Sequence, residues 1–275
     1  STQEGAAYRL YLQPLAVDSE PKLLVADARQ PRVSPDGGRI AFYSTRPDAP
    51  GIAGFERNGV LSPDDRTLRY TTGVRDAQDS PPSWSPTGDA LVFASMREAD
   101  GRSRIYVKPA TPGDDARSLA TGQDPAWAPL DESWVVYNGR PPDGNAPGLW
   151  LTRVDELRWH QLTNNERDRR PAWSPDARYV VVMSDGRDEN WELYRITLSP
   201  ELQPLATARL TNRPAQDGLP AISPDGNHVA FVSDQGGRWR IWVAPLNSSA
   251  QPLPVADIRG ELTSWLEHSI QWIAN

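Results

Sequence analysis

Residues 173–184 read Trp-Ser-Pro-Asp-Ala-Arg-Tyr-Val-Val-Val-Met-Ser, and this stretch decides the fold. Proline at the second position of a turn presets φ, and aspartate after it bonds to the local backbone, so residues 174–177 predict a tight turn. The run that follows, residues 179–184, is rich in β-branched residues and predicts a strand. The stretch therefore predicts a turn that leads directly into a buried strand.

The same unit recurs along the whole chain. Its other copies are Ser34-Pro35-Asp36-Gly37, Ser85-Pro86-Thr87-Gly88, Ser223-Pro224-Asp225-Gly226 and the degenerate Ala128-Pro129-Leu130-Asp131. Successive copies begin 51, 43, 46 and 49 residues apart. A third strand, such as residues 240–243, and a shorter fourth strand, such as residues 209–211, complete a unit. Four strands in about 45 residues, repeated radially, describe the blade of a β-propeller.

We therefore predict one all-β domain over residues 1–275, a six-bladed β-propeller. Residues 8–15 and 22–26 resemble a third and a fourth strand, and residues 268–273 resemble a first strand. The two ends of the chain are thus expected to share one blade, which removes exposed strand edges. That blade is one strand short in this count, and a five-bladed ring with loose ends is the alternative architecture.

A column of large apolar residues stands directly before the turns. Its members are Val33, Trp84, Trp127, Trp173 and Ile222, with Trp272 in the same column at the C-terminal end. Side chains of this size bury large areas, so we expect them to wedge between neighbouring blades rather than to form a binding site.

The Ser-Pro-Asp-Gly turn with its following strands resembles the repeat of TolB-like β-propellers over essentially the whole chain. Residues 173–194 are the best-preserved unit. The resemblance implies a propeller, but such propellers serve as protein-interaction domains, as sensor domains and as gating domains of prolyl-oligopeptidase-like enzymes. It also implies an extracytoplasmic location, periplasmic or exposed at the cell surface. The separate α/β domain of TolB has no counterpart in this sequence.

Composition excludes several classes of function. The net charge is −7 and no basic cluster stands out, so nucleic acid is not an expected partner. The chain has no cysteine, which rules out disulfides and thiolate chemistry. No apolar run is long enough to span a membrane. We expect a monomer without membrane insertion.

Catalytic constellations are missing as well. No Gly-x-Ser-x-Gly elbow or phosphate-binding motif occurs, and His160, His228 and His268 fall in different repeats. The sequence therefore favours a non-catalytic binding or sensor module. The gating propeller of a larger hydrolase is the alternative, and a carbohydrate-active enzyme with channel carboxylates is a further one.

One polar column marks a candidate site. Six residues before the turn serine, or its equivalent, stand Ala28, Asp79, Gly122, Asp168, Asp217 and Glu267. Rotational repetition would bring the four acids to one channel mouth, with Arg169 and Arg170 at its rim and Asp124 close by. The site predicts a protein or small-molecule ligand, or a divalent cation such as calcium, with no other cofactor. The alternative is that these are ordinary solvated loop residues.

Overall fold

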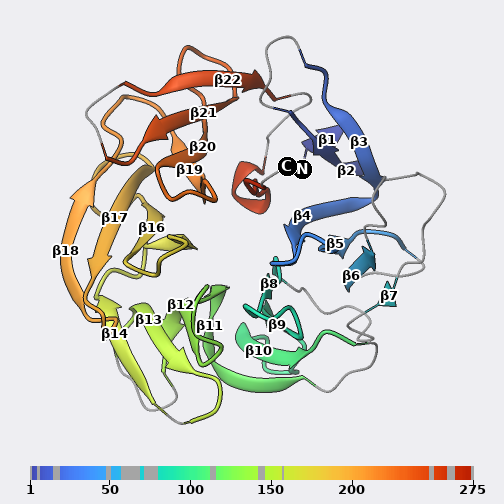
Figure 1. Cartoon of the computed structure of the whole chain (residues 1–275), viewed down its shortest axis with the longest axis vertical. Helices are drawn as coiled ribbons and strands as arrows, with labels where there is room; N and C mark the ends of the chain where they lie inside the picture. The colour runs from blue at the N-terminus through green and yellow to red at the C-terminus, as the bar shows by residue number, and fades with distance from the viewer. Residues whose placement is uncertain are drawn as a thin grey trace.

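The computed structural model describes residues 2–4, 7–14, 19–47, 51–56, 69–70, 80–111, 116–141, 146–156, 158–247, 251–258 and 264–273. In these residues the chain is all-β apart from one 3₁₀ turn, η1 (Trp265–Glu267). The sheets stand around a ring, and the chain follows the ring once from blue to red in Figure 1. The predicted all-β propeller is confirmed.

The described strands form five antiparallel sheets. The sheet nearest the N-terminus contains β1 (Thr2–Glu4), β2 (Ala7–Leu12) and β3 (Lys22–Ala26). The next contains β4 (Ala28–Val33), β5 (Arg39–Ser44), β6 (Gly51–Glu56) and β7 (Arg69–Tyr70).

Two more sheets have four strands in simple up-and-down order. One contains β15 (Arg169–Trp173), β16 (Tyr179–Ser184), β17 (Glu192–Leu198) and β18 (Pro204–Arg209). The other contains β19 (Asp217–Ile222), β20 (His228–Ser233), β21 (Arg240–Pro245) and β22 (Leu253–Asp257).

The remaining sheet has seven strands and contains two repeat units. Its members are β8 (Ser83–Trp84), β9 (Ala90–Ser95), β10 (Arg104–Pro109), β11 (Arg117–Trp127), β12 (Trp134–Arg140), β13 (Gly148–Arg153) and β14 (Trp159–Thr163). The first half of β11 pairs with β10 and its second half with β12, so one long strand ends one unit and begins the next.

The two ends of the chain meet differently from the expectation. β1 pairs with β2 and supplies a strand that sequence analysis had not found. Residues 268–273 do not form a strand, but Gln271 Oε1 accepts a hydrogen bond of 2.6 Å from the Val33 amide and Trp272 lies beside His228. The predicted inner strand of the shared blade is thus absent from the described residues, and the number of blades stays a prediction.

Neighbouring sheets bury the core between them. Val181, Met183 and Leu193 of one sheet pack with Val229 and Phe231 of the next, and all five are at most 2% exposed. The tryptophan column contributes as expected, because indole Nε1 of Trp84 donates to the Arg32 carbonyl at 2.9 Å across two sheets. Trp173 makes the same kind of bond to the Ala126 carbonyl at 3.2 Å.

The Ser-Pro-Asp-Gly segments form the predicted turns at one end of the ring. In four of the turns the fourth residue, Gly37, Gly88, Ala177 or Gly226, donates its amide to the serine carbonyl at 2.8–3.0 Å. The aspartate accepts from the serine hydroxyl at 2.5 Å, as Asp36 does from Ser34. Since successive strands are antiparallel, the inner strands begin at the opposite end, which we call the channel mouth.

Candidate ligand site at the channel mouth

Four inner strands carry the same irregularity near the channel mouth. In each, three residue steps on the inner strand face two steps on its partner, which defines a one-residue β-bulge. The bulged residues are Gln30, Asp124, Arg170 and Leu219. All four have left-handed backbone conformations, with φ between 52° and 58°.

Each of these residues precedes a proline: Pro31, Pro125, Pro171 and Pro220. Proline has no amide hydrogen for the ladder, so within a sheet it is found on edge strands and at bulges, and here each proline lies in the bulge itself. A left-handed conformation costs a residue with a Cβ about 1–2 kcal/mol, and such strain persists only where the surroundings hold it. Glycine would avoid this cost, but none of the four positions has one.

Two of the bulged residues, Gln30 and Arg170, contact the turn η1, which lies in the middle of the ring (Figure 1). Gln30 Nε2 donates to the Glu267 carbonyl at 2.5 Å, and the Arg170 guanidinium donates to the Leu266 carbonyl. Beside Leu219, the ring of Trp265 lies against Gly218. A Cβ added at Gly218 would be only 2.6 Å from Trp265 Cζ3, so the ring packs directly on the glycine. The η1 segment therefore closes the channel mouth with contacts to three inner strands.

Ion pairs fix this closure. Glu267 Oε2 lies 2.5 Å from Arg29 Nη1 and accepts from the Tyr8 hydroxyl at 3.2 Å. Asp124, with its side chain 4% exposed, lies 2.5 Å from Arg169 Nε and 3.3 Å from Arg170 Nε. Burial alone would favour the neutral acid, but the charges of the two arginines lower the pKa of Asp124.

The predicted acidic column separates into two groups. Asp124, Arg169 and Arg170 come together, and Glu267 joins them through the Arg170–Leu266 contact. Asp168 and Asp217 instead are buried at the starts of their own blades, 0% and 2% exposed. Asp79 lies outside the described residues.

The buried aspartates have different surroundings. Asp168 Oδ2 is paired with Arg187 Nη2 at 2.6 Å. Asp217 stands opposite Ser233 in the β19–β20 ladder, and its Oδ1 has no hydrogen-bond partner among the described residues. Burial, opposed by hydrogen bonds from Ser233 and Thr211, raises the pKa of Asp217 to about 6.

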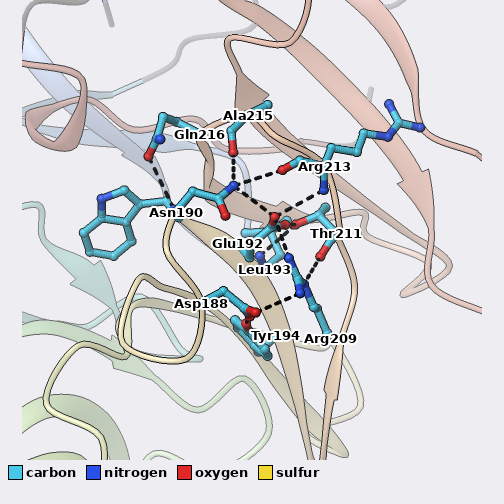
Figure 2. Close-up of polar contacts among 11 residues, drawn as sticks. Asp188, Asn190, Glu192, Leu193, Tyr194, Arg209, Thr211, Arg213, Ala215 and Gln216 are labelled. Atoms are coloured by element: carbon cyan, nitrogen blue, oxygen red, sulfur yellow. Dashed lines mark hydrogen bonds and ion pairs between the residues drawn. The ribbon is translucent and has the colours of Figure 1, made fainter.

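A second polar cluster, which sequence analysis missed, lies close to Asp217 and is drawn in Figure 2. At its centre is Glu192, the first residue of β17, which is fully buried. Its carboxylate accepts from Arg209 Nη2 at 2.9 Å, Asn190 Nδ2 at 3.0 Å, the Arg213 amide at 3.2 Å and the Thr211 hydroxyl. Three of these donors bind Oε1 and one binds Oε2, so both carboxylate oxygens are satisfied and the cluster anchors the connection from β18 to β19.

Catalytic groups do not come together in the part of the chain that the structure describes. There, no three histidines or acids lie close enough to hold a metal ion. His160 Nε2 donates to the Leu202 carbonyl at 2.9 Å, and His268 is buried beside Tyr8, with 5.7 Å between the ring centroids. No helix among the described residues is long and apolar enough to cross a membrane.

The bulges were open to prediction from a signal that the repeat carries. Proline three residues before the turn serine recurs in Pro31, Pro82, Pro171 and Pro220, and Pro125 stands in the same column before Ala128. A proline within a predicted inner strand indicates a bulge. Glu192 offered no comparable signal, because the other third strands begin with glycine or arginine at that position.

Comparisons with known proteins agree with the architecture. No family model matches the chain. Over 226 residues the chain is 24% identical to the uncharacterized peptidase YuxL of Bacillus subtilis, covering 78% of this chain and 31% of that protein. It is 37% identical over 82 residues to TolB 1 of Novosphingobium aromaticivorans, covering 29% and 18%. It is 28% identical over 201 residues to TolB of Anaeromyxobacter dehalogenans, covering 60% and 42%. The chain thus spans less than half of each of these relatives.

Solved structures show the same fold. A structure assigned as TolB from Agrobacterium tumefaciens superimposes with a TM-score of 0.67 at 21% identity, covering 87% of this chain and 85% of that one. The propeller domain of the Trilobed protease from Pyrococcus furiosus, with an open velcro topology, gives 0.57 at 13% identity, covering 92% and 82%. With its repeat, its ring of sheets and these similarities, the chain is a TolB-like β-propeller.

Proposed function

We propose that the chain is a non-catalytic binding module whose ligand site is the channel mouth. The observation that carries this proposal is the set of four strained bulges occupied by Gln30, Asp124, Arg170 and Leu219. Strain of this kind concentrates at functional sites, and here two of the four side chains, those of Gln30 and Arg170, bind the η1 segment. Asp168 and Asp217 contribute by holding the loops around that mouth.

The similarity to TolB proteins favours a protein as the partner and an extracytoplasmic location, although a small molecule fits the same site. The divalent cation expected from the acidic column stays a prediction. Thermal unfolding with calcium and with EDTA tests it directly, because a bound cation raises the midpoint by mass action.

Photo-crosslinking tests the binding role. Leu266 and Leu130 are exposed leucines, 37% and 69%, at the channel mouth and at the turn end respectively. A benzophenone amino acid in place of Leu266 is expected to give a specific adduct in the native cells, whereas the same probe at Leu130 gives none. Adducts at Leu130 alone, or at neither position, would contradict the proposal.

A second candidate is the propeller of a larger hydrolase, favoured by the similarity to the peptidase YuxL over most of this chain. In that case the ring regulates access to a separate catalytic domain. The gene sequence beyond the codon for Asn275 decides, because a hydrolase domain encoded there supports this candidate.

A further inference from the structure

The channel mouth carries more positive than negative charge among the described residues. Arg29, Arg32, Arg169 and Arg170 gather on the inner strands β4 and β15. The acids that pair with them are Asp124 and Glu267. In a chain with a net charge of −7, this local excess runs against the average.

Arg32 is the one of these four arginines that forms no ion pair among the described residues. Its Nη1 donates to the Pro31 carbonyl at 2.8 Å and to Ser269 Oγ at 3.0 Å, and the described residues include no ion pair to it. Burial and the charge of Arg170 lower the pKa of Arg32 to about 10 against the opposing effect of the Asp124 charge, so Arg32 remains cationic at neutral pH. A partly buried cation with no carboxylate paired to it is costly.

Packing of the blades does not require an arginine at this position. The equivalent residues, two before the turn serine or its counterpart, are Ser83, Ala126, Ala172 and Ala221. Four inner strands thus carry a small side chain where β4 carries a long cationic one. Arg32 is therefore an exception to the repeat.

The neighbouring arginines indicate which anion suits the cluster. Arg29 pairs with the carboxylate of Glu267, which belongs to the η1 turn in the middle of the ring. Arg169 and Arg170 pair with the carboxylate of Asp124. Guanidinium groups bind planar carboxylates through paired hydrogen bonds, so a third carboxylate would complete the pattern.

We propose that Arg32, supported by the charge of Arg170, binds the carboxylate of an acidic ligand inside the channel. This inference rests on the proposed binding function and narrows it to anionic ligands. The carboxylate comes either from a small acid or from an acidic peptide, since Glu267 shows that the mouth accommodates a peptide-borne carboxylate.

Thermal unfolding of the full chain tests the proposal with acetate, glutarate and the tripeptide Gly-Glu-Gly, at constant ionic strength set with sodium chloride. We expect at least one of them to raise the midpoint in a saturable manner, by roughly 3 °C or more. The Arg32→Gln variant should lose this rise. The control Arg178→Gln, an 82% exposed side chain beside a turn, should keep it. A larger rise with the tripeptide identifies peptides as the source.

Three results overturn the proposal: no rise with any carboxylate, an equal rise in Arg32→Gln, or a rise with inorganic phosphate alone. If Arg32→Gln does not unfold cooperatively, Arg32→Lys replaces it. That variant keeps the charge but loses the paired geometry, so the carboxylate concentration at half-effect should increase. None of these results bears on the crosslink at Leu266, which tests the binding role independently.

Discussion

The tight turns and the inner-strand bulges both need left-handed residues, but different residue types fill them. At the turns, Gly37, Gly88 and Gly226 adopt φ of 70°, 76° and 71° without a Cβ penalty. At the bulges, residues with long side chains accept the penalty, and Arg170 and Gln30 are the clearest cases. The turns therefore place glycine at the left-handed positions and avoid strain. The bulges accept the strain and keep side chains, those of Gln30 and Arg170, that contact η1.

The largest difference between the two regions should be in the stability lost when a carboxylate is removed. Glu192→Ala removes the acceptor of four donors at the channel-mouth end and leaves Arg209 without one of its carboxylates, so we expect a loss of about 3 kcal/mol. Asp225→Ala at a turn removes only local hydrogen bonds of an exposed carboxylate and should cost clearly less than Glu192→Ala.

Urea unfolding measures both free energies. Glu189→Ala, an exposed residue of the same loop as Asn190, is the control and should change stability by less than about 0.5 kcal/mol. Equal costs for Glu192→Ala and Asp225→Ala would mean that the polar cluster of Figure 2 does not anchor the channel-mouth loops.

The pH dependence should have opposite signs in the two regions. Because the folded pKa of Asp217 is raised to about 6, ionising it opposes folding, and this penalty is absent below pH 4 and complete above pH 6. Asp217→Asn is therefore expected to stabilise the protein by about 2–3 kcal/mol at pH 8 and to have little effect near pH 4.

Asp225 provides the matched comparison at a turn. Hydrogen bonds from Ser223 and Asn227 lower its pKa to about 2, so its ionised form favours folding. Asp225→Asn should destabilise at neutral pH, and the difference from the wild type should vanish as the pH falls from 4 through 2. Unfolding midpoints of both variants from pH 2 to 8 decide; parallel profiles would contradict the assignment.

Backbone strain should give the smallest effect. Ala177 occupies the position that is glycine in the equivalent turns, and its backbone is left-handed with φ of 56°. Ala177→Gly should therefore stabilise the protein by about 0.5–1 kcal/mol. Gly37→Ala is the reverse change at an open position, where an added Cβ meets nothing within 4 Å, and should destabilise by about 1 kcal/mol. Two changes of the same sign would show that packing, not φ, controls these turns.

Sequence patterning predicted the repeat, the turns and the role of the tryptophan column, because each depends on local rules that every unit repeats. It did not predict β1, whose three residues carry no strand signal. It predicted from the rotational repetition of the units that Asp168 and Asp217 line the channel mouth. In the structure, the ladder position of Asp217 opposite Ser233 buries this side chain within its own blade. The pairing of Arg29 with Glu267 joins residues 238 positions apart, which no local pattern could reveal.

The most direct test of the difference between the two regions combines binding with stability in the same cells. With the photo-reactive probe at Leu266, the account predicts that Arg170→Gln lowers the adduct yield per folded molecule, because it alters the surface around η1. Asp225→Ala should lower the unfolding midpoint and leave that yield unchanged. An adduct that survives Arg170→Gln but is lost in Asp225→Ala would contradict the account, since the turns would then carry the binding function.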